Sequence, residues 1–141
     1  MKGKILIVDD EADLRELLKS VLESDYAVTT AENAAALQKH FLHEAPDIVL
    51  LDLKLPKLSG LDVLKQVRAD PRTELLPVVI LTSSNEDEDI LSCYRSGANS
   101  YVRKPVEFER FADAVKQLGC YWLLVNQFPP IALSQSNQTE E

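Results

Sequence analysis

The stretch ILIVDDEADLRELLKSVL, residues 5–22, contains one complete strand, turn and helix. Residues 5–8 form a short apolar run, which is typical of a strand buried on both faces of a parallel sheet. An acidic turn follows at residues 9–11. After this turn, apolar residues repeat at the spacing of a helix that packs on one side: Leu14, Leu17, Leu18, Val21 and Leu22. The stretch therefore predicts a strand that leads directly into an amphipathic helix.

The same alternation continues along the chain. Further strand-like runs cover residues 27–30, 48–51, 78–81 and 100–102, and a segment of helical spacing follows each of them. Asn33 can cap the second helix, and Asn85 with Glu88 resembles a capping box for the fourth. The expected inward positions of the second to fifth helices are Leu37 and Phe41; Leu61, Leu64 and Val67; Leu91 and Tyr94; and Phe108, Phe111, Ala112, Val115 and Leu118.

Five strand–helix units in strict alternation predict an α/β fold. We expect a doubly wound five-stranded parallel sheet with flavodoxin-like strand order 2-1-3-4-5 and helices on both faces. The chain has 141 residues, which suits one domain. Its four glycines form neither a P-loop nor a GxGxxG motif, which excludes those two nucleotide-binding folds, and its two cysteines form no CxxC pair.

Charge and hydropathy exclude two kinds of partner. The net charge of -8, from 15 basic and 23 acidic side chains, lacks the positive surface that direct DNA binding needs. No apolar run approaches the ~18 residues of a membrane span. The apolar stretch near the N-terminus ends at Asp9, too early for a secretory signal peptide. We therefore expect a cytoplasmic protein without membrane association.

Polar side chains are predicted to meet at one edge of the sheet. Ligands of such folds bind beyond the carboxyl ends of the strands, near the point where the strand order reverses. The residues that follow the first, third, fourth and fifth strands are Asp9 and Asp10, Asp52, Thr82, and Lys104. Taken singly, Asp10 could cap a helix, Thr82 could belong to a turn and Lys104 could be solvated. Together, three carboxylates would repel one another unless Mg²⁺ joined them, and Lys104 could meet an anion.

At these positions the sequence resembles the receiver domain of two-component response regulators. The matching segments are residues 5–11, residues 47–53 with Pro56 and Gly60 after them, residues 81–83, and Lys104-Pro105. The resemblance extends over residues 2–119. It implies that Asp52 is a phosphoacceptor that attacks a phosphohistidine on a sensor histidine kinase. Such a protein is a signalling switch, not an enzyme, and catalyses only its own phosphorylation and dephosphorylation.

The resemblance also implies a metal cofactor beside Asp52. Asp10, Asp52 and the backbone carbonyl of Lys54 would ligate Mg²⁺, and Asp9 would support the ion through water. The Lys54 side chain occupies a position where receivers vary and where side chains affect hydrolysis of the phosphoryl group. It could shield the phosphate or point to solvent, so the sequence leaves the lifetime of the phosphorylated state open.

Other residues would form the switch. By resemblance, Lys104 pairs with the phosphoryl oxygens, Thr82 hydrogen-bonds one of them, and Tyr101 turns inward when the threonine moves. A cis peptide bond is expected before Pro105. The signal would be read at the face of the fourth helix, fifth strand and fifth helix, by a target protein that the sequence does not identify.

Alternative functions fit less well. An aspartate-nucleophile phosphatase of the haloacid dehalogenase type wants a second aspartate two residues after the nucleophile, where this chain has Lys54. An FMN-binding flavodoxin-like module needs a loop rich in glycine and hydroxyl groups after the first strand, and the acidic residues 9–11 would repel its phosphate. His40 and His43 have metal-pair spacing, but a solvated helix face explains them better.

The C-terminal segment predicts a surface for association. We expect a receiver domain at 1–120, then an extension of the last helix and a disordered tail at 121–141, with no output domain. Residues 121–125 are all apolar, so the helix should run past Gly119 and need cover. The extension could fold back on its own domain or form a homodimer, which we favour. It resembles receivers that serve phytochrome-type kinases, which suggests a phytochrome-like sensor kinase.

Overall fold

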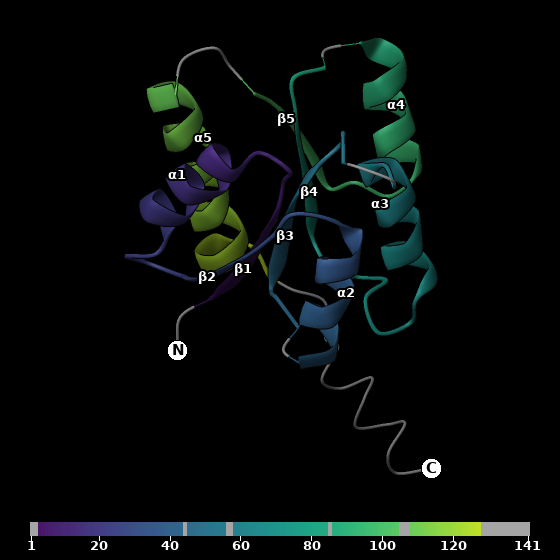
Figure 1. Ribbon diagram of the computed structural model, residues 1–141, viewed down its shortest axis with the longest axis horizontal. Coiled ribbons are helices and arrows are strands. Elements are labelled where there is room, and N and C mark those ends of the chain that lie inside the picture. Colours follow the sequence, from purple (N-terminus) through teal and green to yellow (C-terminus); the bar gives the residue numbers. More distant parts are fainter. Residues whose placement is uncertain (1–2, 44, 56–57, 85, 105–107, 128–141) are drawn as a thin grey trace.

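The computed structural model contains one five-stranded sheet between two layers of helices (Figure 1). The structure describes residues 3–43, 45–55, 58–84, 86–104 and 108–127. All neighbouring strands pair in parallel, in the order β2-β1-β3-β4-β5. The strands are β1 (Lys4–Val8), β2 (Ala27–Ala31), β3 (Ile48–Asp52), β4 (Val78–Thr82) and β5 (Ser100–Arg103). The predicted fold class and strand order are therefore confirmed.

The inner strands are buried because they are apolar on both faces. Every residue of β3 and β4 is buried, as are the last four residues of β1. Val8 pairs with Leu51, and Asp52 pairs with Leu81 on the next strand. This register brings the carboxyl ends of β1, β3 and β4 to the same edge of the sheet, so the residues that follow them meet there.

Helices cover both faces of the sheet (Figure 1). The first layer holds α1 (Ala12–Leu22) and α5 (Phe108–Cys120), and the second holds α2 (Ala34–His43), α3 (Gly60–Ala69) and α4 (Asp87–Arg95). Leu18 of α1 and Val115 of α5 belong to the core of the first layer, whereas Leu64 of α3 belongs to the core of the second. Asn33 caps α2 as predicted, because its Oδ1 accepts a hydrogen bond from the Ala36 N–H at 3.0 Å.

The predicted inward face of α4 is wrong. Leu91 and Tyr94 are each 49% exposed, and the buried residue of this helix is Cys93. The helix begins at Asp87 after the cap residue Glu86, whose side chain makes no capping hydrogen bond. This short acidic helix has few apolar residues, and their spacing fits more than one buried face. The sequence therefore does not decide which side of the helix packs inward. The capping residue that we predicted, Asn85, lies outside the described residues.

The last helix continues past Gly119 as a π-helix over Tyr121–Val125. Trp122 and Leu123 pack against the core beneath α1 and α5. A Cβ atom added to Gly3 would lie 2.8 Å from a Leu123 methyl group, so this segment sits close against the start of β1. Leu124 is 73% exposed, so the extension both folds back and leaves apolar surface uncovered.

Some predicted positions lie outside what the structure describes. These are the side chains of Phe41, Phe108, Phe111, Ala112 and the two histidines His40 and His43, and the whole of Pro56, Pro105 and residues 128–141. The expected cis bond before Pro105 and the expected disordered tail therefore stay predictions.

Candidate functional site

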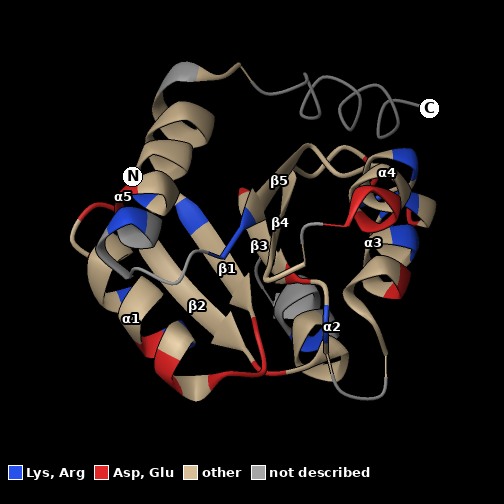
Figure 2. Ribbon diagram, turned by 90° about the horizontal axis from the view of Figure 1, so that it is seen from above, with Lys and Arg blue, Asp and Glu red and all other residues tan. Residues whose placement is uncertain are grey.

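Three aspartates meet where β1 and β3 end. One carboxylate oxygen from each of Asp9, Asp10 and Asp52 lies within 4.8 Å of the others. Asp9 is 1% exposed and Asp52 is 4% exposed, whereas Asp10 faces solvent. Figure 2 shows the acidic residues in red where β1 leads into α1. The site is thus a buried pair of carboxylates with a third at its mouth.

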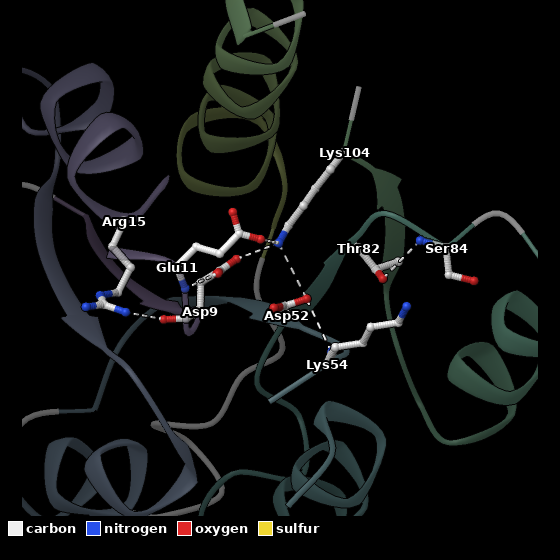
Figure 3. A network of polar contacts seen from close by, with 8 residues as sticks. All are labelled: Asp9, Glu11, Arg15, Asp52, Lys54, Thr82, Ser84 and Lys104. Atoms are coloured by element: carbon white, nitrogen blue, oxygen red, sulfur yellow. Dashed lines mark hydrogen bonds and ion pairs between the residues drawn. The ribbon is translucent and has the colours of Figure 1, made fainter. Parts of the chain in front are cut away.

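Lys104 places a positive charge among these carboxylates (Figure 3). Its Nζ lies 2.8 Å from Asp9 Oδ2, 3.5 Å from Asp52 Oδ1 and 3.7 Å from Glu11 Oε1. Its backbone N–H donates to the Thr82 carbonyl at 2.7 Å, which fixes the chain just after β5. Burial alone would lower the pKa of Lys104, but its short contact with Asp9 and the surrounding negative charges outweigh burial and raise it. The lysine is therefore held charged.

Asp52 is held in an environment that disfavours its charged form. Burial, the largest cause, and the negative charge of Asp9 raise the pKa of Asp52 to about 6 from 3.8. Lys104 and the Lys54 N–H, which donates to Asp52 Oδ1 at 3.3 Å, oppose this rise only in part. The Lys54 side chain itself is exposed. A further cation beside Asp52 would relieve the remaining cost of its charge.

The donor atoms fit a divalent cation. Asp9 Oδ2 is buried and accepts no hydrogen bond of regular geometry from the described residues, so its contact is the ion pair with Lys104. Clustered carboxylate oxygens with an open side are the ligands that Mg²⁺ uses in proteins, where it keeps several waters. The exposed position of Asp10 leaves such an open side. The predicted metal residues Asp9, Asp10 and Asp52 are therefore brought together in a fitting arrangement.

Ser84 connects the Thr82 hydroxyl to two other elements. Its N–H donates to Thr82 Oγ1 at 3.2 Å, and its hydroxyl donates to Asp89 Oδ2 of α4 at 2.5 Å. Its carbonyl accepts a hydrogen bond from the Tyr101 hydroxyl of β5 at 2.7 Å. Tyr101 thus lies half-buried against the loop that follows β4. A movement of Thr82 would reach both α4 and β5 through this one residue.

Gly60 allows α3 to start directly beside the end of β3. A Cβ atom at this position would overlap with the carbonyl oxygen of Asp52 and lie 2.7 Å from the Leu53 Cα. The Gly60 N–H donates to the Leu53 carbonyl at 2.8 Å, and Ser59 caps the helix by accepting from the Asp62 N–H. Only glycine permits this close approach, so the backbone after Asp52 is fixed from two sides.

Sequence reasoning missed three polar residues of the site. Arg15 of α1 donates from Nη1 to the Asp9 carbonyl at 2.6 Å, and Glu11 faces Lys104. Arg15 looks like an ordinary charged residue of an amphipathic helix, and only its place four residues after Glu11 hints that it faces the turn at the end of β1. Ser84 carried no signal beyond its closeness to Thr82.

Within the part of the chain that the structure describes, no helix has the length and apolar character needed to cross a membrane.

Residues 5–116 match the family described as the response regulator receiver domain. The chain is also 41% identical over 103 residues to the probable methanogenesis regulatory protein FilR2 of Methanothrix harundinacea. These aligned residues make up 70% of this chain. It spans 66% of FilR2 and about half the length of several other curated relatives.

Solved structures show the same fold. The phosphorylated cyanobacterial phytochrome response regulator RcpA has a TM-score of 0.84 and 29% identity, and the match covers 92% of this chain and 99% of RcpA. The Mn²⁺-bound form of response regulator Rcp1 has a TM-score of 0.81 and 26% identity, and the match covers 90% of this chain and 99% of Rcp1. The sequence match and the structural match therefore agree over nearly the whole described chain.

Proposed function

Because the chain belongs to the response regulator receiver domain family, we propose that Asp52 accepts a phosphoryl group from the phosphohistidine of a sensor histidine kinase. Receiver domains are phosphorylated on aspartate by histidine kinases, and they bind Mg²⁺ or Mn²⁺ at an acidic pocket. The main support for the proposal in this chain is the position of the Asp52 side chain. It lies buried at the end of β3, among two further aspartates and 3.5 Å from Lys104 Nζ.

The transfer step needs little beyond position and charge. A carboxylate oxygen of Asp52 would attack the phosphorus as its bond to the histidine nitrogen breaks, and the electron pair of that bond would stay with the imidazole. Lys104 Nζ would pair with a phosphoryl oxygen, and the Thr82 hydroxyl would donate to another. Mg²⁺, held by Asp10, Asp52 and the Lys54 carbonyl with Asp9 in support, would neutralise the carboxylates and the phosphoryl oxygens.

The phosphorylated aspartate would then act on its surroundings. An added charge of about -1.5 to -2 beside Asp9 and Asp10 would draw the Thr82 hydroxyl towards it. Thr82 accepts a hydrogen bond from Ser84, which contacts Asp89 and Tyr101, so the pull would reach α4 and β5. We place the output face there and on α5, with a protein target that the sequence and fold do not identify.

The cellular setting follows from the same proposal. The phytochrome response regulator RcpA supports a phytochrome-like sensor kinase as the phosphoryl donor. Phosphoryl transfer from a histidine kinase favours a cytoplasmic location. The net charge of -8 argues against direct DNA binding by this domain. A phosphatase function is not favoured, because Lys54 stands where the second aspartate of such an enzyme would be.

Labelling with acetyl phosphate tests the acceptor. Wild-type protein with Mg²⁺ should gain one phosphate, visible by intact-mass spectrometry and removed by alkali or hydroxylamine. Asp52→Asn should gain none. Asp47→Asn, at the residue just before the other end of β3, is the matched control and should label as the wild type does. Labelling of Asp52→Asn to the wild-type level would overturn the assignment.

We also propose that the extension of the last helix forms a homodimer. Tyr121 and Leu124 are 50% and 73% exposed, and both belong to the π-helix that extends α5. An isologous pair would cover both copies of this apolar surface. Light scattering with chromatography should give a dimer for the wild type and a monomer for the double variant Tyr121→Ser, Leu124→Ser. A wild-type monomer at high micromolar concentration, with and without phosphorylation, would contradict the dimer.

A further inference from the structure

Arg15 contacts the turn that carries two of the three clustered aspartates. Its Nη1 donates to the carbonyl oxygen of Asp9 at 2.6 Å, across the start of α1 (Figure 3). That carbonyl belongs to the peptide unit that joins Asp9 to Asp10. The guanidinium therefore sets the orientation of the peptide plane between two carboxylates that we assign to the metal site.

Every polar atom of Asp9 has a contact in the structure. Its N–H donates to the Ala31 carbonyl at 3.1 Å, Oδ1 accepts from the Glu11 N–H at 2.9 Å, and Oδ2 lies 2.8 Å from Lys104 Nζ. The Arg15 contact is the one that acts on the carbonyl and so on the peptide leading to Asp10. Asp9 is thus fixed at four points.

Asp10 depends on this peptide for its position. Among the described residues, its side chain takes part in no hydrogen bond or ion pair, and it faces solvent. Its place near Asp9 and Asp52 is therefore set by the backbone. Rotation of the peptide between Asp9 and Asp10 would swing the Asp10 carboxylate away from the cluster, and the bond from Arg15 opposes that rotation.

We infer that Arg15 is a positioning residue for the metal site, which acts by fixing the peptide between Asp9 and Asp10. The inference rests on the proposed function, because it concerns the Mg²⁺ that this function requires. Residues that orient metal ligands without touching the metal typically change its affinity by about 10–100-fold when they are replaced. The planar guanidinium, with its fixed donors, suits this role better than an ammonium group.

Substitutions at Arg15 should leave the fold intact. Its side chain is half-buried and lines an open hollow of about 240 Å³ together with Ala12, Glu16, Lys19 and Thr30. A shorter or uncharged side chain there creates no closed cavity in the core. Lys19 lines the same hollow one turn further along α1, so Lys19→Met removes an equal charge without touching Asp9 and serves as the matched control.

The test measures metal affinity directly. Mn²⁺ binding is followed by water-proton relaxation and Mg²⁺ by competition, for Arg15→Met, Arg15→Gln, Arg15→Lys, Lys19→Met and Asp10→Ala. We expect Arg15→Met to weaken metal binding about tenfold or more. The affinity of Arg15→Lys should be closest to that of the wild type, and the affinity of Arg15→Gln should lie between those of Arg15→Lys and Arg15→Met. Lys19→Met should change affinity less than about twofold, because an exposed charge is screened by salt. Urea midpoints in EDTA should stay close to the wild-type value.

The results for Arg15 and Asp10 distinguish the role of Arg15 from the proposed metal site itself. Wild-type affinity in Arg15→Met, with binding lost in Asp10→Ala, overturns the role of Arg15 and leaves the proposed metal site standing. An equal loss in Lys19→Met also overturns it, since the effect would then not depend on the contact with the Asp9 carbonyl. Wild-type affinity in Asp10→Ala shows that the cation binds elsewhere, and the proposed site fails. If Arg15→Met does not fold, weakened binding in folded Arg15→Gln supports the role and unchanged binding overturns it.

Discussion

Replacing Asp52 by asparagine should stabilise the metal-free protein at neutral pH. The Asp52 carboxylate is 4% exposed and lies beside Asp9, and these surroundings raise its pKa to about 6. The unfolded chain would ionise it near the ordinary value of 3.8. The folded state therefore holds the charged form at a cost, which the neutral amide of asparagine does not bear.

The magnitude follows from the two pKa values. The difference between 3.8 and about 6, at about 1.36 kcal/mol per pH unit, corresponds to about 3 kcal/mol. Because the pKa of the folded state is the higher one, the penalty is absent below pH 3.8, grows as the pH rises and is complete above about pH 6. Asp52→Asn should thus gain up to about 3 kcal/mol at pH 7.5, or about 10 °C in melting temperature, and almost nothing at pH 4.

Urea unfolding in EDTA at the two pH values measures this gain. Asp113→Asn removes one negative charge from an exposed position of α5 and controls for net charge. Millimolar Mg²⁺ should narrow the gap between the wild type and Asp52→Asn, because a bound cation relieves the same repulsion. The reasoning is refuted if Asp52→Asn is no more stable than the wild type at pH 7.5, or if it gains equally at pH 4.

Other substitutions at the rim test separate contacts. Mg²⁺ should raise the wild-type melting temperature, and Asp10→Ala should blunt that rise in scanning fluorimetry; an unchanged rise would place the cation elsewhere. Lys104→Ala should keep Mg²⁺ binding, since an ammonium group is no metal ligand, yet lower acetyl phosphate labelling about tenfold or more. Wild-type labelling would remove Lys104 from the reaction. Gly60→Ala should lower the free energy of unfolding by about 1–3 kcal/mol, because its Cβ would overlap with the Asp52 carbonyl; an unchanged urea midpoint would argue against that close approach.

The sheet could be predicted from the sequence because its signal is local and strong. The runs at residues 5–8, 48–51 and 78–81 are apolar throughout, and each forms a buried strand extended by one residue at one end. Parallel strands share one direction, so the residues after them must meet at one edge. This rule is sufficient to group Asp9, Asp52 and Lys104 at the rim.

The phase of α4 could not be predicted in the same way. The helix has nine residues, with acidic side chains in its first turn, and the apolar residues Ile90, Leu91, Cys93 and Tyr94 spread around it. Periodicity over so short a segment fits more than one face. Packing decides the face, because Cys93 is small enough to lie against the sheet while Tyr94 stays outside.

The hydrogen bonds of the site also lie beyond sequence reasoning. Lys104 contacts three acceptors and stands closest to Asp9, a choice that depends on side-chain positions and not on spacing. The same is true of Arg15 and of Ser84, whose partners come from other elements of the fold. Sequence can therefore predict which residues gather at the rim, but the partner of each is set by the packed structure.

The acidic rim and the buried strands depend on each other. The strands that bring Asp9 and Asp52 together also keep them from water, so the arrangement that forms the site makes its charges costly. The full burial of β3 and β4 offsets that cost, because apolar burial is the main favourable contribution to folding. Charge added at the rim therefore acts on groups that are already poorly solvated, where its effect is larger than in water. Ser84 links Thr82 to α4 and β5 by hydrogen bonds, so the rim is connected to elements that lie at the surface.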